Sequence, residues 1–217
     1  MQTIGLLGGT FNPIHFGHLR MAQELADSLS LNSVKFIPSA NPPHKPEPQV
    51  SAEHRAAMVQ LAITGNSQFQ FDGRELSRTG ASYTVETLES LRNELGDHAG
   101  LVLIMGSDAF TKFNTWHRWQ EIIKLCHIAL VQRPASTNKE SLTKELETFL
   151  HNNYTEHTQD LHESSAGLIT MQAITPLEIS STAIRQALQL KHSAHYLMPE
   201  NVLDYIAVNQ LYSADSA

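Results

Sequence analysis

Residues 3–18 read TIGLLGGTFNPIHFGH, and this stretch decides the fold. Its first part, 3–8, is short and apolar, which predicts a buried strand that ends in a glycine turn. Residues 17–30 then carry apolar side chains at helical spacing, namely Leu19, Ala22, Leu25, Ala26 and Leu29. The stretch is therefore expected to form a strand, a turn and a helix, the repeating element of an α/β fold.

Expected strands and helices alternate along the rest of the chain. The strands are apolar runs at 34–38, 69–72, 101–106, 127–134 and, more weakly, 167–172. The helices begin near Ser51, cover 83–95 and 139–152, and begin again at Ser180 and near Pro199, while 153–166 is expected to be a loop. Because the strongest strands are apolar throughout, the pattern predicts a Rossmann-like, doubly wound α/β fold, a mostly parallel sheet with helices on both faces. We expect one domain over 1–217, with a C-terminal helical part from about 180.

The composition narrows the class of protein. Of the 217 residues, 41% are hydrophobic and 17% charged, which favours a packed core over a disordered chain. A net charge of −7 disfavours binding to nucleic acid or to acidic membranes. No apolar run approaches the roughly 20 residues that cross a bilayer, and no basic leader is present, so we expect a cytoplasmic protein. Cys126, the single cysteine, cannot form an internal disulfide and is expected to be a buried structural thiol.

The stretch 8–18 also has the features of a phosphate site. Gly8 and Gly9 allow the backbone to approach phosphate oxygens, and the following helix N-terminus offers N–H groups and positive potential. His15 and His18 are three residues apart, so both can point at one position and donate to an oxygen there. The pattern is neither GxGxxG nor GxxxxGK[ST]. An ordinary turn with surface histidines is the alternative, whereas no third ligand lies at a spacing typical of zinc sites.

A second candidate phosphate site is ISSTAIR, residues 179–185. Its three hydroxyl side chains can cap a helix start, and Arg185, one turn on, can bind phosphate oxygens with two N–H groups. Alone, this pattern is typical of an ordinary capped helix. Together with 8–18, it provides two anion-binding helix starts on one sheet, which suits a triphosphate.

Three further stretches are candidates for a second substrate pocket. Asn41–Lys45 is a loop stiffened by prolines that presents two potential cations. Ser82–Thr84 lies at a helix start that favours an anion, although capping alone would explain its hydroxyls. Gly106–Asp108 follows the central strand, where a carboxylate can accept ribose hydroxyls, and Trp116 after it can stack on a ring or belong to the core.

These stretches resemble a known family. Residues 8–18 are similar to the shared element GGTF[DN]PxHxGH of the HxGH nucleotidyltransferase superfamily, with Asn12 where Asp is more frequent, and 179–185 resemble its second element, ISSTxIR. The remaining stretches resemble the nicotinate mononucleotide adenylyltransferase branch, which has a PPHK or PPHR loop, an SYT segment, a GxD strand end and a following Trp. Arg133-Pro134, expected after a strand, fits this branch too. The resemblance covers essentially the whole chain.

The resemblance implies an enzyme that moves AMP from ATP to the 5′-phosphate of nicotinate mononucleotide, with Mg²⁺ bound to the ATP and no metal ligands on the protein. It implies that the catalytic residues are His15, His18 and Arg185. The ATP-binding residues would be Gly8, Gly9, Thr10, Phe11, His15, His18, Gly106, Asp108, Arg133, Ile179, Ser180, Ser181, Thr182 and Arg185. The mononucleotide would be held at its phosphate by Asn41, His44 and Lys45, at its carboxylate by Tyr83 and Thr84, and at its ring by Trp116.

Two alternatives remain open at this point. One is another adenylyltransferase of the superfamily, specific for nicotinamide mononucleotide or FMN, because only the resemblance favours the acid over the amide. The other is a nucleotide-binding protein without catalytic activity, against which the intact histidines and Arg185 argue. The expected partners are ATP and nicotinate mononucleotide, with neither nucleic acid nor membrane, in a monomer or a homodimer.

Overall fold

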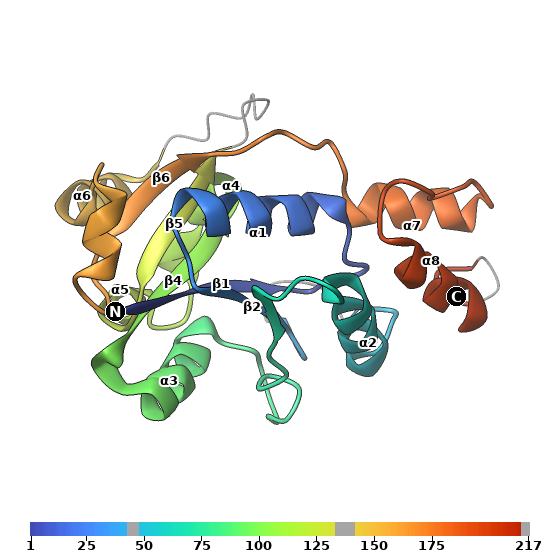
Figure 1. The fold of residues 1–217 in the computed structure, drawn as a ribbon, viewed down its shortest axis with the longest axis horizontal. Coiled ribbons are helices and arrows are strands. Elements are labelled where there is room, and N and C mark those ends of the chain that lie inside the picture. Colours follow the sequence, from blue (N-terminus) through green and yellow to red (C-terminus); the bar gives the residue numbers. More distant parts are fainter. Residues whose placement is uncertain (43–47, 133–141, 214–217) are drawn as a thin grey trace. The chain divides into compact units, whose positions relative to one another are not determined.

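The structure is a computed structural model that describes residues 1–42, 48–132 and 142–213 (Figure 1). The chain forms two compact units. The first comprises Met1–Leu7, Glu24–Lys35 and Tyr83–Pro176, and the second comprises Gly8–Gln23, Phe36–Ser82 and Leu177–Ala217. Three elements near the N-terminus contribute residues to both units. No helix in the described ranges is long and apolar enough to span a membrane.

Strands and α-helices alternate as the apolar pattern predicts. The strands are β1 (Gln2–Gly9), β2 (Ser33–Pro38), β3 (Phe69–Phe71), β4 (Ala99–Gly106), β5 (His127–Gln132) and β6 (Ile169–Ala173). The α-helices are α1 (Phe16–Ser28), α2 (Ala52–Ile63), α3 (Thr84–Leu95), α4 (Ser107–Phe110), α5 (Trp119–Leu125), α6 (Lys144–Asn153), α7 (Ser181–Gln189) and α8 (Glu200–Val208). Short 3₁₀ helices are η1 (Gly96–His98), η2 (Phe113–Thr115) and η3 (Thr158–His162).

The six strands form one sheet in the order β3-β2-β1-β4-β5-β6. β4 pairs in parallel with β1 and with β5, and β5 pairs in parallel with β6. In the register of this sheet Leu6 lies opposite Leu103, and Ile128 lies opposite Ile169. The doubly wound α/β fold predicted from the apolar strands is confirmed. Strand order reverses between β1 and β4, and α/β sheets bind ligands beyond the carboxyl ends of their strands at such a reversal.

Helix packing can be followed within each unit. In the first unit α3 lies beside α5, and in the second unit α2 lies beside α8 (Figure 1). The core consists of apolar residues of the strands and of the helices that cover them. The strands β4 and β5 are buried along almost their whole length, as the long apolar runs at 101–106 and 127–132 require.

Some element boundaries differ from the predicted ones. Helix α5 was not predicted, because its seven residues, Trp119–Leu125, are too few to establish a helical period. Helix α6 begins at Lys144 instead of 139, because the Thr143 side chain caps it by accepting a hydrogen bond from Leu146 N. The expected loop 153–166 contains η3, and Pro199 is the N-cap of α8 instead of its first helical residue. The expected end of β5 at 133–134 lies outside the described residues.

Arg92 ties the elements of the first unit together near the start of β4. Its Nε donates to Leu125 O at 2.7 Å, and its Nη2 donates to Ser165 O at 2.6 Å. Its Nη1 donates to the carbonyl oxygens of Gly96 and Ala99, at 2.9 and 2.8 Å. Burial lowers the pKa of the Arg92 guanidinium. One side chain thereby joins the ends of α3 and α5 to the amino end of a central strand.

Cys126 and His127 are buried at the start of β5. The Cys126 thiol is fully covered, and burial raises its pKa to about 12, so the predicted structural thiol is confirmed. His127 Nδ1 accepts a hydrogen bond from Leu168 N at 3.2 Å, so the ring proton is on Nε2, which donates to Ser164 O at 2.8 Å. This geometry requires a neutral ring, because a second ring proton would face the N–H of Leu168. In agreement, burial lowers the pKa of His127.

We expect the free energy of unfolding to fall as the pH drops through about 6.5, the ordinary pKa of histidine, because the unfolded chain then takes up a proton that folded His127 resists. The contribution of His127 is present above that pH, is lost below it, and has a slope of at most about 1.4 kcal/mol per pH unit. Urea unfolding at a series of pH values between about 8 and 5 measures this slope.

The variant His127→Gln should be less stable at pH 8 and should show a shallower pH dependence than the parent protein. The exposed residue His151, changed to Gln, serves as the control and should keep the parent slope. Equal slopes in the parent and in His127→Gln would show that another group is responsible.

Candidate nucleotide site

The stretch 8–18 lies in the second unit, with a turn conformation that differs from the expected one. Gly8 and Gly9 are the last residues of β1, and neither has positive φ. The turn is made by Phe11, with φ 47°, so the predicted glycine turn is wrong in this respect. The Phe11 ring is buried and lies edge-on to the His18 ring at 5.2 Å. The packing of this ring in the core holds a backbone conformation that is uncommon for a bulky side chain.

His15 and His18 lie against each other at the start of α1. Their ring centroids are 3.8 Å apart with an interplanar angle of 32°, and His15 is buried while His18 is half-buried. Gly17 makes this arrangement possible, because a Cβ at that position would lie 2.9 Å from His15 Nδ1 and 3.5 Å from Ile179 O. The spacing of the two histidines therefore places both rings at one point, as their separation of three residues predicts.

The start of α7 contacts the loop that precedes His15. Ser180 caps the helix by accepting from Ala183 N at 3.1 Å, as its position predicts. Ser181 Oγ donates to Pro13 O at 2.8 Å, and Arg185 Nη1 donates to Asn12 O at 2.8 Å. Two stretches that are about 170 residues apart in the sequence thus lie together within one unit.

Arg185 is positioned by two hydrogen bonds. Besides its bond to Asn12 O, its Nη2 donates to Thr182 Oγ1 at 3.4 Å, and the side chain is half-buried. A guanidinium has five N–H donors, so these two bonds orient it while leaving it the capacity to bind an anion. Thr182 is exposed at the same helix start.

Tyr212 and Arg55 also contact the loop before His15, and neither was predicted from the sequence. Tyr212 Oη donates to Asn12 Oδ1 at 2.6 Å, and burial raises the pKa of this phenol. Arg55, in α2, is 1% exposed and donates to Thr10 O at 2.7 Å. A spacing pattern cannot identify these residues, since each acts on the loop across 45 or more positions of sequence.

Ser82 holds the start of the proline-rich loop in the second unit. Its Oγ accepts hydrogen bonds from Ala40 N and Asn41 N at 3.1 and 3.2 Å, and Ser82 N donates to Asn41 O at 2.9 Å. The alternative that Ser82 is only a helix cap is therefore wrong, since its hydroxyl faces another loop. The Asn41 residue is exposed. Three predicted site residues lie outside the described residues, namely His44, Lys45 and Arg133.

Tyr83 and Thr84 begin α3 in the first unit. Tyr83 is the N-cap residue, and its side chain makes no capping hydrogen bond. Its ring packs instead on the imidazole of His117, with centroids 4.4 Å apart. Both Tyr83 and Thr84 are half-buried. This helix start therefore has an aromatic pair beside backbone N–H groups that its own N-cap side chain does not satisfy.

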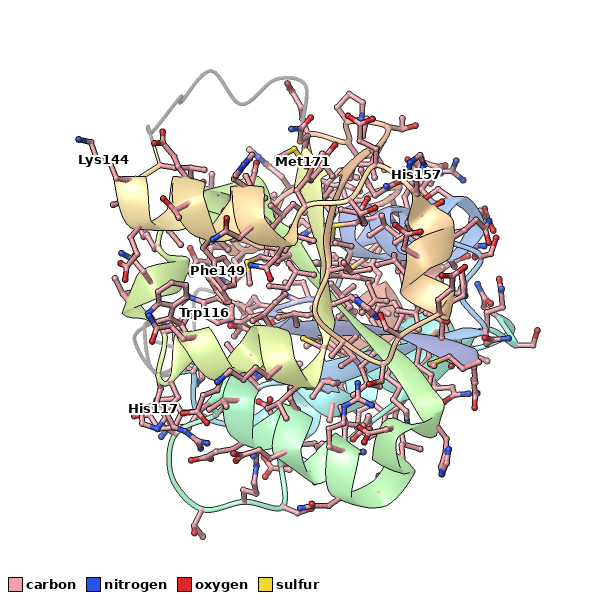
Figure 2. The ribbon with its side chains drawn as sticks, turned by 90° about the vertical axis from the view of Figure 1, so that its left-hand side faces the viewer. Trp116, His117, Lys144, Phe149, His157 and Met171 are labelled. Carbon is pink, nitrogen blue, oxygen red and sulfur yellow. The ribbon has the colours of Figure 1, made fainter. Side chains whose placement is uncertain are left out.

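Trp116 lies in the first unit on an aromatic cluster formed by η2, α5 and α6. Its ring meets Phe113 edge-on at 5.5 Å, and Phe113 also contacts Phe149, at 5.9 Å. Figure 2 shows Trp116 and Phe149 on the same side of this unit, with His117 following in the chain. Trp116 is half-buried, so it combines core packing with partial exposure, and neither sequence alternative describes it alone.

Gly106 and Asp108 lie at the carboxyl end of β4. A Cβ on Gly106 would be 2.3 Å from Asp108 Oδ1, so only glycine allows this carboxylate to fold back over the end of the strand. Asp108 is exposed and lies in the first turn of α4. Within 1–42, 48–132 and 142–213, no three His, Cys, Asp or Glu side chains are grouped to hold a metal ion.

The chain is similar in sequence to a known protein family. The Cytidylyltransferase-like family model matches residues 6–187. A Dechloromonas aromatica protein named "Probable nicotinate-nucleotide adenylyltransferase" is 45% identical over 212 residues, which cover 97% of this chain and 98% of that protein. A Pseudomonas entomophila protein of the same name is 43% identical over 216 residues, covering 100% and 97% of the two chains.

Solved structures share the fold at low sequence identity. Plasmodium falciparum nicotinic acid mononucleotide adenylyltransferase complexed with APC matches with a TM-score of 0.72 at 15% identity, over 98% of each chain. The same Plasmodium enzyme complexed with NaAD matches with a TM-score of 0.72 at 16% identity, again over 98% of each chain. These likenesses support the α/β architecture seen in the sheet.

Proposed function

The chain belongs to the nicotinate-nucleotide adenylyltransferase family of Cytidylyltransferase-like proteins, and we propose that it transfers AMP from ATP to nicotinate mononucleotide. The products would be nicotinate adenine dinucleotide and pyrophosphate, in NAD biosynthesis. The observation that carries the proposal is the contact between 8–18 and 179–185, in which the loop that leads into the two stacked imidazoles also binds the Arg185 guanidinium.

We propose that this gathered set binds the triphosphate. His15 and His18 would donate to phosphate oxygens on which charge develops, and Arg185 would hold the departing pyrophosphate. The start of α7, from Ile179 to Thr182, would add N–H and hydroxyl donors. Gly8 faces open space, since a Cβ there would meet no atom within 4 Å, and with Gly9, Thr10 and Phe11 it would form the backbone wall along the nucleotide.

In the proposed reaction, the protein contributes mainly by positioning the two substrates and by stabilising charge. The phosphate monoester of the acceptor is already a nucleophile at neutral pH, and its oxygen would attack the α-phosphorus of ATP directly. The bond from the α-phosphorus to the bridging oxygen breaks, and pyrophosphate leaves with that electron pair. Neither a covalent enzyme intermediate nor a strong general base is needed, so the rate depends on alignment and on donors aimed at the leaving group.

Mg²⁺ bound with ATP would neutralise charge on the phosphate oxygens. In the described part of the second unit, the proposed phosphate site offers imidazole, guanidinium and hydroxyl groups. These groups suit a metal ion held by the nucleotide's own oxygens, since Mg²⁺ prefers oxygen ligands and retains waters.

We propose that three stretches of the chain hold the acceptor. Asn41, with His44 and Lys45, would contact its phosphate. Tyr83 and Thr84 would bind the pyridine carboxylate, supported by the absence of a side-chain cap from Tyr83 at the start of α3. Trp116 would stack on the ring. Asp108 beside Gly106 would accept hydroxyls of the ATP ribose, and Arg133 would complete the ATP site.

We infer that 1–217 acts as a single nucleotidyltransferase domain. The family match over 6–187 includes parts of both units and supports this inference. We further propose a cytoplasmic protein, a monomer or homodimer, that binds neither nucleic acid nor membranes, in keeping with its net charge of −7.

Pyrophosphate release tests the proposal directly. The purified chain, with ATP and Mg²⁺, is given nicotinate mononucleotide, nicotinamide mononucleotide or FMN in separate reactions. Release with the acid, at a kcat/KM at least about tenfold above that with the amide, is the expected outcome. A preference for the amide or for FMN would identify a different adenylyltransferase, and no release with any acceptor would identify a nucleotide-binding protein without catalysis.

His18→Ala should lower kcat by about 10²–10³-fold, the usual effect of losing a donor to a developing oxyanion, while the KM for the mononucleotide changes little. The exposed His195 of the same unit, changed to Ala, is the control and should keep the parent kcat. Turnover near the parent value in His18→Ala would remove His18 from the catalytic set.

Trp116→Ala should raise the KM for the mononucleotide by about tenfold, because a stacked ring contributes about 1–3 kcal/mol. Trp119 belongs to the same aromatic cluster, with its ring 5.6 Å from Phe113, and provides a matched control. Trp119→Ala should lower the melting temperature and leave this KM unchanged. If both variants alter KM equally, packing of the cluster explains the effect and stacking does not.

A further inference from the structure

Arg55 is a buried arginine whose guanidinium binds backbone carbonyl groups in the second unit. It lies in α2 and is 1% exposed. Its Nη1 donates to Thr10 O and to Ser39 O, at 2.7 Å each. Its Nη2 donates to Ala40 O at 3.2 Å, and its Nε donates to Val50 O at 3.3 Å. Four of its five N–H donors therefore hold main-chain oxygens.

The carbonyl groups that Arg55 binds belong to two functional loops. Thr10 follows the carboxyl end of β1 and opens the stretch that contains His15 and His18. Ser39 and Ala40 follow the carboxyl end of β2 and lead directly into Asn41. One Nη1 atom bridges the two loops, and Ser39 N also donates to Gly9 O at 2.9 Å. The first loop is the one proposed to bind ATP, and the second is the one proposed to bind the acceptor phosphate.

We propose that Arg55 is a positioning residue that sets the distance between the ATP loop and the acceptor-phosphate loop. This inference rests on the proposed function. Transfer between two bound substrates depends on alignment, and a misplacement of about 1 Å can cost on the order of 100-fold in rate. Within the described residues, the hydrogen bonds of the Arg55 side chain all go to backbone carbonyl groups. Arg55 thus acts on the backbone from which the proposed ligand-binding side chains project.

Ser82 restrains the second loop from its other side. Its hydroxyl accepts from Ala40 N and Asn41 N, while Arg55 binds Ala40 O. The peptide groups that precede Asn41 are thus held through both their N–H and their carbonyl groups. In the described part of the chain, the hydrogen bonds of Ser82 go to the acceptor loop, whereas those of Arg55 go to both loops, so we expect different kinetic effects from the two residues.

Arg92 shows the same mode of bonding in a place remote from the proposed chemistry. It also donates through Nε, Nη1 and Nη2 to four carbonyl groups, and burial lowers its pKa as it lowers that of Arg55. One of its acceptors is Ala99, the first residue of β4. It therefore acts at the amino end of a strand, whereas Arg55 acts beyond the carboxyl ends, where α/β sheets bind ligands.

The test compares Arg55→Lys, Arg92→Lys and Ser82→Ala with the parent protein. Lysine keeps the charge but carries its three donors on one atom, so it cannot bind four carbonyl groups arranged around a planar guanidinium. Melting temperatures are measured first, and kinetics are then run at a temperature at which all variants are folded. The ATP Kd is measured by calorimetry, and kcat and the KM for the mononucleotide are measured by pyrophosphate release.

Arg55→Lys should raise both the ATP Kd and the acceptor KM by about tenfold and lower kcat by more than that, because it loses charge-assisted hydrogen bonds on both loops. Arg92→Lys should lower the melting temperature about as much as Arg55→Lys does. Its ATP Kd, its acceptor KM and its kcat should stay within about twofold of the parent values. Ser82→Ala should raise the acceptor KM alone, by about fivefold.

The proposal is overturned if folded Arg55→Lys has parent kinetics, or if Arg92→Lys reproduces its kinetic losses. If Arg55→Lys does not fold, Ser82→Ala decides, since an unchanged acceptor KM would show that the loop position does not control acceptor binding. A parent protein that releases no pyrophosphate with any acceptor refutes the proposed function instead. In that case the ATP Kd of Arg55→Lys still tests whether Arg55 positions the ATP loop.

Discussion

A guanidinium that is removed from water must find acceptors for its N–H groups, and Arg55 finds them on the backbone of two loops. Loops lack the regular hydrogen bonds of strands, so their carbonyl groups need other donors when they are covered. One planar side chain satisfies Thr10, Ser39 and Ala40 together, which links the segments that follow β1 and β2. The segment that carries the two histidines and the segment proposed to bind the acceptor phosphate both begin at this point.

At the proposed phosphate site, the oxygens of Asn12 likewise accept hydrogen bonds from distant side chains. Its carbonyl accepts from Arg185 and its side-chain oxygen accepts from Tyr212, while the neighbouring Pro13 carbonyl accepts from Ser181. The loop at Asn12 and Pro13 thus orients Arg185, and Ser181 at the start of α7 in turn holds this loop in place. Donors that are fixed before a nucleotide arrives need no rearrangement when charge develops, which is the condition for effective electrostatic stabilisation. A short polar residue suits this position because both of its oxygens are used.

Prediction from the sequence succeeded where the pattern was local. Apolar runs marked all six strands, and hydroxyl residues marked the start of α7, because period and capping depend on neighbours in the chain. Prediction failed where a segment was short or where contacts with distant side chains set the backbone conformation. Helix α5 has too few turns to show a period. The turn after β1 is made by Phe11 instead of a glycine, because its ring is buried against Phe36 and His18.

The sequence by itself determined the fold class and the family, and it marked two stretches proposed to bind phosphate, because motif letters and apolar periods are properties of the chain. The tertiary structure decided which groups hold those stretches in place. Arg55, Ser82, Arg92 and Tyr212 carry no recognisable motif, and their roles come from hydrogen bonds that close loops over long sequence separations. Such contacts depend on where the packed core places each backbone carbonyl, and no pattern of neighbouring residues records that position.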